Sequence, residues 1–333
     1  MGIEAATAAL IGGAVATLAA SWALISRLER LGERFGLSEG LLGLVAAVAA
    51  DTPEITAAVV ALVEHQRTVS TGVIIGSNIF KLAALLGLGA VVAGRVGLHR
   101  KVVILGGSVS LWVSLVCLLT VMGLLVPGVG LLLVLAALVP YLVAIGTPRT
   151  FLRRLPLPGS WTAWLASAVE EEELELEVAI RPRQAHWRDG LVAMVALAIV
   201  VGASALMERG ASVLGVHFGV AEIVVGGLVL AATTSLPNAV AAVHLAAQGR
   251  GAATLSTALN SNSVNVLVGM LIPATLVGLA RPSGPGLVDA GWYVGLTLTT
   301  LVLAYWRRGL ARQAGWLIIV GYLAFVATLL AVS

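Results

Sequence analysis

The chain has 333 residues, of which 59% are hydrophobic and 11% are charged, whereas about a quarter of the residues are charged in an ordinary soluble domain. This composition excludes a soluble globular fold, because no interior of this size hides so much apolar surface. The formal net charge of +3 does not indicate a nucleic-acid surface. The arginines lie in short turns between hydrophobic segments, which is typical of membrane topology signals.

Apolar segments long enough to cross a hydrocarbon core of about 30 Å as helices recur along the chain. Strand-like alternation of apolar and polar residues does not accompany them. The sequence therefore predicts an all-α polytopic membrane protein rather than a β-barrel. The ten predicted spans are 3–25, 40–63, 71–94, 102–125, 128–146, 190–207, 221–246, 254–279, 290–306 and 314–332.

The first span begins beside Glu4 with no Lys or Arg before it, which favours a retained span over a cleaved signal peptide. Cys117 lies in the fourth span, where a small buried apolar side chain is expected.

Basic residues predict the orientation of the spans. With the N-terminus outside, sixteen Lys and Arg residues fall in turns on the inside, and only Arg67, Arg209 and Arg281 fall outside. The positive-inside rule therefore predicts an inner (plasma) membrane protein with both termini outside.

The longest connection, 148–189, is predicted to be a cytoplasmic linker between a first half, 1–147, and a second half, 190–333. Each half holds five spans, an odd number, so the two halves are expected to be inserted in opposite orientations. The linker carries an acidic run from Glu170 to Glu177. A solvated loop is the favoured interpretation, and a regulatory metal site is the alternative, although alternating Glu and Leu lacks the ligand spacing of a calcium loop. Trp161 and Trp164 are candidate interface anchors.

An internal repeat relates the two most polar hydrophobic segments, which superpose after a shift of 184 residues. The first segment contains Asp51-Thr52-Pro53-Glu54 and then Gly76-Ser77-Asn78-Ile79-Phe80-Lys81. The second contains Thr234-Ser235-Leu236-Pro237-Asn238 and then Asn260-Ser261-Asn262-Ser263-Val264-Asn265. Proline falls on proline, and Ser-Asn falls on Ser-Asn.

A proline at mid-membrane removes an amide donor and frees carbonyl groups that hydrocarbon cannot satisfy. We therefore predict helix breaks at Pro53 and Pro237. Broken helices at matching places in two inverted halves indicate the binding site of a transporter. An ordinary kink is the alternative for one such proline, but the duplicated motif favours the binding site.

Asp51, Glu54 and Lys81 are the three ionisable residues expected deep in the membrane, where each costs roughly 2.5 to 3.5 kcal/mol on insertion scales. The two carboxylates are three residues apart and share a helix face. For Lys81 two interpretations stay open, a salt bridge that neutralises the carboxylates or an amine that titrates or mimics the transported ion. His244, near the cytoplasmic end of the seventh span, is expected at the membrane surface.

At these two segments, over 40–94 and 224–279, the chain resembles the sodium/calcium exchanger family of the cation/calcium antiporter superfamily, as a divergent member of prokaryotic type. The motifs of that family are Gly-Thr-Ser-x-Pro-Glu and Gly-Ser-Asn-Ile-Phe-Asn, in two inverted halves of five spans. The resemblance implies a secondary-active antiporter that exchanges calcium or another cation against sodium or protons. Access alternates by sliding of the first and sixth spans, and no cofactor is implied. The partners expected are inorganic cations and membrane lipid, without nucleic acid.

The resemblance also implies a binding site with members from both halves. The ion-binding residues are Asp51, Glu54, Ser77, Asn78, Lys81, Thr234, Ser235, Asn238, Ser261, Asn262 and Asn265, with Asp51 and Glu54 as metal ligands.

The chain departs from the family motif where Asn238 replaces a glutamate, Lys81 replaces an Asn or Asp, and Ala50 and Asp51 replace Thr and Ser. The site then carries a formal charge of minus one with Lys81 protonated. Calcium favours about six to eight oxygen ligands, with several carboxylates among them.

Two alternatives remain open at this stage. One is a proton-coupled carrier of monovalent cations or another solute that uses Lys81, and the other is a non-transporting scaffold or sensor with the exchanger fold. An enzyme is not expected, because the predicted spans hold neither a metal-binding His cluster nor a nucleophile with its base.

Overall fold

The computed structural model describes residues 1–34, 39–146, 160, 162–168, 186–247 and 251–333. The helices before the long connection are α1 (Ile3–Arg34), α2 (Glu39–Val63), α3 (Arg67–Lys81), α4 (Gly89–Ala93), α5 (Arg100–Val121) and α6 (Pro127–Gly146). Those after it are α9 (Trp187–Phe218), α10 (Glu222–Val224), α11 (Ala231–Ala247), α12 (Gly251–Val264), α13 (Ile272–Val277), α14 (Gly284–Trp306) and α15 (Arg312–Val332).

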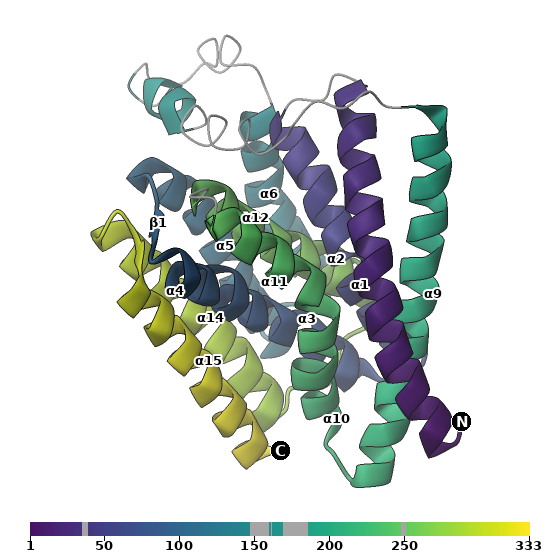
Figure 1. The fold of residues 1–333 in the computed structure, drawn as a ribbon. Coiled ribbons are helices and arrows are strands. Elements are labelled where there is room, and N and C mark those ends of the chain that lie inside the picture. Colours follow the sequence, from purple (N-terminus) through teal and green to yellow (C-terminus); the bar gives the residue numbers. More distant parts are fainter. Residues whose placement is uncertain (35–38, 147–159, 161, 169–185, 248–250) are drawn as a thin grey trace.

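Helices occupy the place of every predicted span. Within the described ranges, nine are long and apolar enough to cross a membrane, and the remaining predicted span coincides with α2, which carries Asp51 and Glu54. Both termini lie at the same end of the helices (Figure 1), as an even number of spans requires. The prediction of an all-α polytopic membrane fold is confirmed.

Three π-helical segments interrupt the spans, η1 (Leu82–Leu88), η2 (Val225–Leu230) and η3 (Asn265–Leu271). The shift of 184 residues brings η1 almost onto η3. The predicted helix breaks at the prolines are wrong, because Pro53 lies inside α2 and Pro237 inside α11. A proline removes one amide donor and bends a helix without ending it when neighbouring groups satisfy the freed carbonyls. The irregular backbone lies in the π-helical segments instead.

The centre of the fold is the crossing of α3 with η2. In the span Arg67–Ala93, 89% of the apolar stretch is buried, against 22% in the span Arg312–Val332. Gly76 touches the backbone of Gly227, and a Cβ added at Gly76 would overlap that backbone. Glycine therefore lets the backbones of the two sequence repeats meet in the middle of the molecule.

The helices α1 and α9, the first and sixth spans, lie side by side at one side of the molecule (Figure 1). They pack closely because Gly13 faces Met207 and Gly210 faces Ala6. The Arg27 guanidinium binds the Asp189 carboxylate at 2.7 Å and joins the two helices near one end. These are the two spans that the family resemblance expects to slide.

Two short strands, β1 (Arg95–Gly97) and β2 (Gly309–Ala311), form an antiparallel pair in which Val96 faces Leu310. The strands were not predicted from the sequence, because three residues are too few for alternation to be visible. The pair joins the turns after the third and ninth spans, so these turns lie on the same side of the membrane. Both were predicted on the inside.

Several predictions fall outside the described residues. They are most of the 148–189 connection with its acidic run, Trp161, and the side chain of His244. Trp164 lies in the described helical residues 162–168 and is 36% exposed.

Candidate functional site

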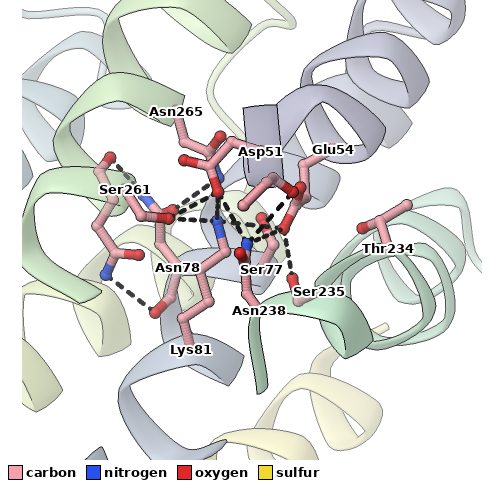
Figure 2. Close-up of polar contacts among 12 residues, drawn as sticks. Asp51, Glu54, Ser77, Asn78, Lys81, Thr234, Ser235, Asn238, Ser261 and Asn265 are labelled. Carbon is pink, nitrogen blue, oxygen red and sulfur yellow. Dashed lines mark hydrogen bonds and ion pairs between the residues drawn. The ribbon is translucent and has the colours of Figure 1, made fainter. Parts of the chain in front are cut away.

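The predicted polar residues converge where α2, α3, α11 and α12 meet (Figure 2). Asp51 and Glu54 project from one face of α2 into this cluster, and neither has any exposed surface. Lys81, at the end of α3, is equally buried. Three ionisable groups buried inside a membrane fold need partners, because hydrocarbon does not solvate charge.

The Lys81 ammonium lies between the two carboxylates. Its Nζ donates to Asp51 Oδ1 at 2.6 Å and to Ser261 Oγ at 2.7 Å, and it is 3.1 Å from Glu54 Oε1. Asp51 and Glu54 thus share one ammonium, and the cluster keeps a formal charge of minus one. The salt bridge, one of the two interpretations left open for Lys81, is present.

Residues of the second repeat also donate hydrogen bonds to the carboxylates. Ser261 Oγ donates to Asp51 Oδ1 at 2.7 Å, and Asn238 Nδ2 donates to the same oxygen at 2.9 Å. Ser235 Oγ donates to Glu54 Oε1 at 2.9 Å. The carboxylates of one repeat are therefore held by the polar side chains of the other, and Asn238 lies beside Glu54 at 3.4 Å.

A reciprocal pair of asparagines marks the two-fold relation of the repeats. Asn78 Nδ2 donates to the Asn262 carbonyl at 3.1 Å, and Asn262 Nδ2 donates to the Asn78 carbonyl at the same distance. These residues are 184 positions apart, the period of the sequence repeat. Asn265, the counterpart of Lys81, donates to Asn78 Oδ1 at 3.2 Å.

Two predicted ligands, Ser77 and Thr234, donate their hydroxyl protons to backbone carbonyls instead of to the cluster. Ser77 Oγ donates to the Ile74 carbonyl at 3.1 Å, and Thr234 Oγ1 donates to the Leu230 carbonyl at 2.7 Å. Thr234 lies apart from the other labelled side chains in Figure 2. The structure therefore brings together all the predicted site residues except Thr234.

Several oxygens of the cluster are left with unused acceptor capacity. Asp51 Oδ2, Glu54 Oε2, Asn262 Oδ1 and Asn265 Oδ1 are buried, and within the described residues they have no hydrogen-bond partner. All four are acceptors, so a proton donor or a cation would satisfy them. Carboxylate and amide oxygens are the ligands that hard cations prefer, and these atoms therefore suit an inorganic cation. The described ranges contain no group of three or more His, Cys, Asp and Glu side chains that could hold a metal.

Two further buried carboxyls were missed. Asp289 on α14 and Glu208 on α9 have no exposed surface. The ninth span was predicted at 290–306 and the sixth at 190–207, so both residues lie one position outside a predicted span. The helices extend past these limits and bury them.

Comparison with protein families assigns both halves of the chain to one family. The sequence profile of the family described as sodium/calcium exchanger protein matches residues 5–148 and 190–331. The chain belongs to the sodium/calcium exchanger family, whose members are membrane antiporters of cations. The family assignment made from the two sequence motifs is confirmed.

Individual relatives match to different extents. The inner membrane protein YrbG of Escherichia coli is 25% identical over 97% of this chain and 96% of its own length. The putative antiporter CaxA of Alkalimonas amylolytica is 35% identical over 26% of this chain, and the match spans 28% of CaxA. The sodium/potassium/calcium exchanger 3 of Rattus norvegicus is 29% identical over 35% of this chain, but over only 18% of its own length.

Solved structures show the same fold. The sodium-calcium exchanger NCX_Mj, soaked with sodium and strontium, superposes with a TM-score of 0.63 at 19% identity. The match covers 98% of this chain and 99% of NCX_Mj. The fold of two inverted repeats predicted from the sequence is therefore confirmed.

Proposed function

We propose that this protein is a secondary-active antiporter of inorganic cations, in which the transported cation and the Lys81 ammonium alternate at the same oxygens. One observation carries the proposal. Lys81 Nζ contacts Asp51, Glu54 and Ser261 at 2.6 to 3.1 Å, while the second oxygen of each carboxylate has no partner within the described residues. The ammonium is thus a cation of the protein itself, held by oxygens that would also suit an inorganic cation.

Charge balance limits what the site accepts. With the ammonium in place, one monovalent cation would neutralise the cluster, whereas calcium would leave a net charge of plus one. Calcium binding therefore requires Lys81 to withdraw from the carboxylates. The ligands we assign to the transported cation are Asp51, Glu54, Ser77, Asn78, Ser235, Asn238, Ser261, Asn262 and Asn265. Thr234 is not assigned as a ligand, because its hydroxyl donates to the Leu230 carbonyl of its own span.

The exchange we propose is calcium against sodium or protons by alternating access. It is supported by the family assignment and by the names of the rat exchanger and NCX_Mj, which include calcium and sodium. The excess of basic residues in alternate turns supports an orientation with both termini outside and the 148–189 connection in the cytoplasm. The halves 1–147 and 190–333 would then form the two inverted units.

Calcium uptake into proteoliposomes tests the role of the carboxylates. Glu54→Gln replaces a carboxylate with an amide of similar size and removes one of the two negative charges. We expect sodium-driven or pH-driven calcium uptake to fall by at least about tenfold, the effect of about 1.4 kcal/mol of lost binding. Glu4→Gln, an exposed carboxylate at the start of α1, is the matched control. Wild-type flux in Glu54→Gln would remove the central role of Glu54.

A second candidate function follows from the position of Lys81. A carrier of monovalent cations needs no withdrawal of the ammonium, because the cluster carries minus one and a single positive charge balances it. Sodium and potassium uptake, measured beside calcium uptake at several pH values, separates the two functions. If no cation is taken up and none shifts the thermal unfolding of the purified protein, a non-transporting scaffold with this fold is favoured instead.

A further inference from the structure

A second buried carboxyl lies outside the Lys81 cluster. Asp289 is on the second turn of α14, has no exposed surface, and within the described residues neither of its oxygens has a hydrogen-bond partner. Its Oδ2 lies 3.8 Å from the position of a Cβ added to Gly227. The carboxyl therefore sits against the crossing of α3 and η2, where the two repeats meet.

Asp289 begins a row of polar side chains on α14. Tyr293, Thr297 and Thr300 follow at intervals of four, four and three residues and thus share its helix face, and all are fully buried. From Asp289 to Thr300 this row rises about 16 Å, over half of a hydrocarbon core. The hydroxyls of Thr297 and Thr300 have no partner within the described residues.

A matching row lies on α5, which runs antiparallel to α14. Cys117 lies within electrostatic reach of Asp289 while its thiol donates to Met270 Sδ at 3.7 Å, and Gly107 faces Leu301. The same register places Ser110 opposite Thr297, and the buried Ser110 hydroxyl is likewise without a partner among the described residues. We call these facing rows the α5–α14 polar lane, and its members are Ser110, Cys117, Asp289, Tyr293, Thr297 and Thr300.

The polar lane reaches the cation cluster through Tyr293. The Tyr293 hydroxyl is near enough to the Asn78 side chain for a polar interaction, although within the described residues no hydrogen bond of good geometry joins them. Asn78 is bonded to Asn262 and Asn265. Tyr293 is one helical turn from Asp289 on α14, so it lies between Asp289 and the residues at the centre of the repeat pair.

The other ionisable groups on α14 and the elements packed against it have different partners or positions. Among the described residues, Cys117 of α5 lies within electrostatic reach of Asp289. Those engaged elsewhere are Lys81 with Asp51, Arg67 with the Leu279 carbonyl, Arg100 with Tyr305, Lys101 with Ser167, Arg312 with the Val91 carbonyl, and Tyr322 with Phe80. Asp289 is thus buried without a charged partner among the described residues.

We propose that Asp289 is a proton-binding site of the antiporter, separate from the cation cluster and linked to it by the α5–α14 polar lane. The inference rests on the proposed antiport and names the ion exchanged. One proton from water binds one carboxylate oxygen of Asp289 and gives a neutral acid, and its release restores the negative charge. That charge offsets a cation arriving at the cluster.

A proton fits this position better than a metal ion does. Asp289 lies beside Gly227 and within electrostatic reach of the Cys117 thiol, and neither residue adds a carboxylate or side-chain oxygen. One carboxylate supplies too few oxygen ligands for a sodium or calcium ion. A proton needs no coordination shell. An unpaired carboxylate deep in a membrane protein is costly, so the neutral acid is a stable resting form.

Infrared spectroscopy of the purified protein tests proton binding without any transport. We expect the wild type to show a carboxylic-acid C=O band that disappears on raising the pH, and Asp289→Asn to lack it. Asp189→Asn, which removes a carboxyl of the Arg27 ion pair, is the matched control and keeps the band. Asp289→Glu retains a carboxyl, and we expect the band to shift in frequency, which keeps the test available if the amide variant does not fold.

Proteoliposomes test the link to transport. In Asp289→Asn and Tyr293→Phe, we expect stimulation of calcium uptake by a pH gradient to fall by about tenfold or more, while equilibrium calcium binding stays within about twofold of wild type. An unchanged infrared titration in Asp289→Asn, or wild-type stimulation in either variant, overturns the inference. If the wild type binds no cation, the proposed function fails, and the infrared result still decides whether Asp289 holds a proton.

Discussion

Lys81→Asn is the substitution that separates the two roles of the ammonium most sharply. Position 81 corresponds to Asn265 after the shift of 184 residues, and Asn265 Nδ2 donates to Asn78 Oδ1 at 3.2 Å. By the same symmetry, an amide at position 81 faces Asn262 Oδ1, which has no partner within the described residues. The variant therefore removes the charge and gains a hydrogen bond that the fold already uses in its other half.

The size of the effect follows from the distances in the cluster. A cation at the Asp51 and Glu54 oxygens would lie about 4 Å from the ammonium, and two unit charges at that separation repel by about 4 kcal/mol at an effective dielectric constant of 20. The repulsion is about 8 kcal/mol for a divalent cation. If rearrangement and water reduce this to about 2.7 kcal/mol, removal of the ammonium raises calcium affinity about a hundredfold.

The assay is calcium titration of purified protein by calorimetry, with sodium, magnesium, manganese and potassium tested in parallel. Without cation, Lys81→Asn leaves two buried carboxylates uncompensated, so we expect it to be about 3 to 5 kcal/mol less stable than wild type. Calcium should then raise its unfolding temperature more than that of wild type. Lys101→Asn removes an ammonium that bonds to Ser167, outside the cluster, and is the control. Calcium affinity equal to or below that of wild type would refute competition between Lys81 and the cation.

Three further substitutions test the packing and bonding of the centre. Gly76→Ala places a Cβ in the Gly227 backbone and should destabilise the folded protein by about 1 to 3 kcal/mol or more. The control Gly227→Ala brings its Cβ no closer than 3.5 Å to another atom and should be tolerated. Equal unfolding temperatures of the two variants would contradict the crossing of α3 with η2. Asn262→Ala loses the hydrogen bond to the Asn78 carbonyl and should lower the free energy of unfolding by about 1 to 3 kcal/mol. A denaturation midpoint equal to that of wild type would contradict this. Asp51→Asn leaves the ammonium with one carboxylate and should lower thermal stability and cation binding together; unchanged binding would place the cation elsewhere.

The sequence predicted the fold well because the bilayer imposes a minimum apolar length on every helix that crosses it. Each predicted span coincides with a helix, and the count of basic residues in alternate turns matches an even number of spans. The motif residues were also predicted to meet, since the period of 184 relates Asn78 to Asn262 and Lys81 to Asn265. Repetition of the proline and of the Ser-Asn pair at the same spacing in otherwise apolar segments has few explanations other than a shared site.

Local backbone geometry was predicted less well. Proline was expected to break two helices, but Pro53 and Pro237 lie inside continuous ones. The irregular turns are π-helical and lie in Leu82–Leu88, Val225–Leu230 and Asn265–Leu271, where Leu, Val and Gly give no local signal of a wider turn. Their position depends on tertiary packing at the repeat crossing, which a single sequence does not express.

The missed carboxyls have a different cause. Hydropathy gives the apolar centre of a span more reliably than its ends, and Asp289 and Glu208 each lie one residue beyond a predicted end. A charged residue itself shortens the apparent span, because it lowers the local hydropathy. The helices nevertheless continue, and the charge becomes buried among neighbouring helices. Carboxyls near span ends are therefore easily missed when spans are predicted from hydropathy.

The central claim is that one cation binds between the two repeats at the oxygens that Lys81 now occupies. Anomalous scattering from crystals soaked with strontium, a divalent cation close to calcium in chemistry, locates that ion directly. We predict a peak within about 3 Å of both the Asp51 and Glu54 carboxylates, with the Lys81 ammonium displaced from them. A peak remote from these carboxylates, or a bound ion with the Lys81 contacts intact, would contradict the claim.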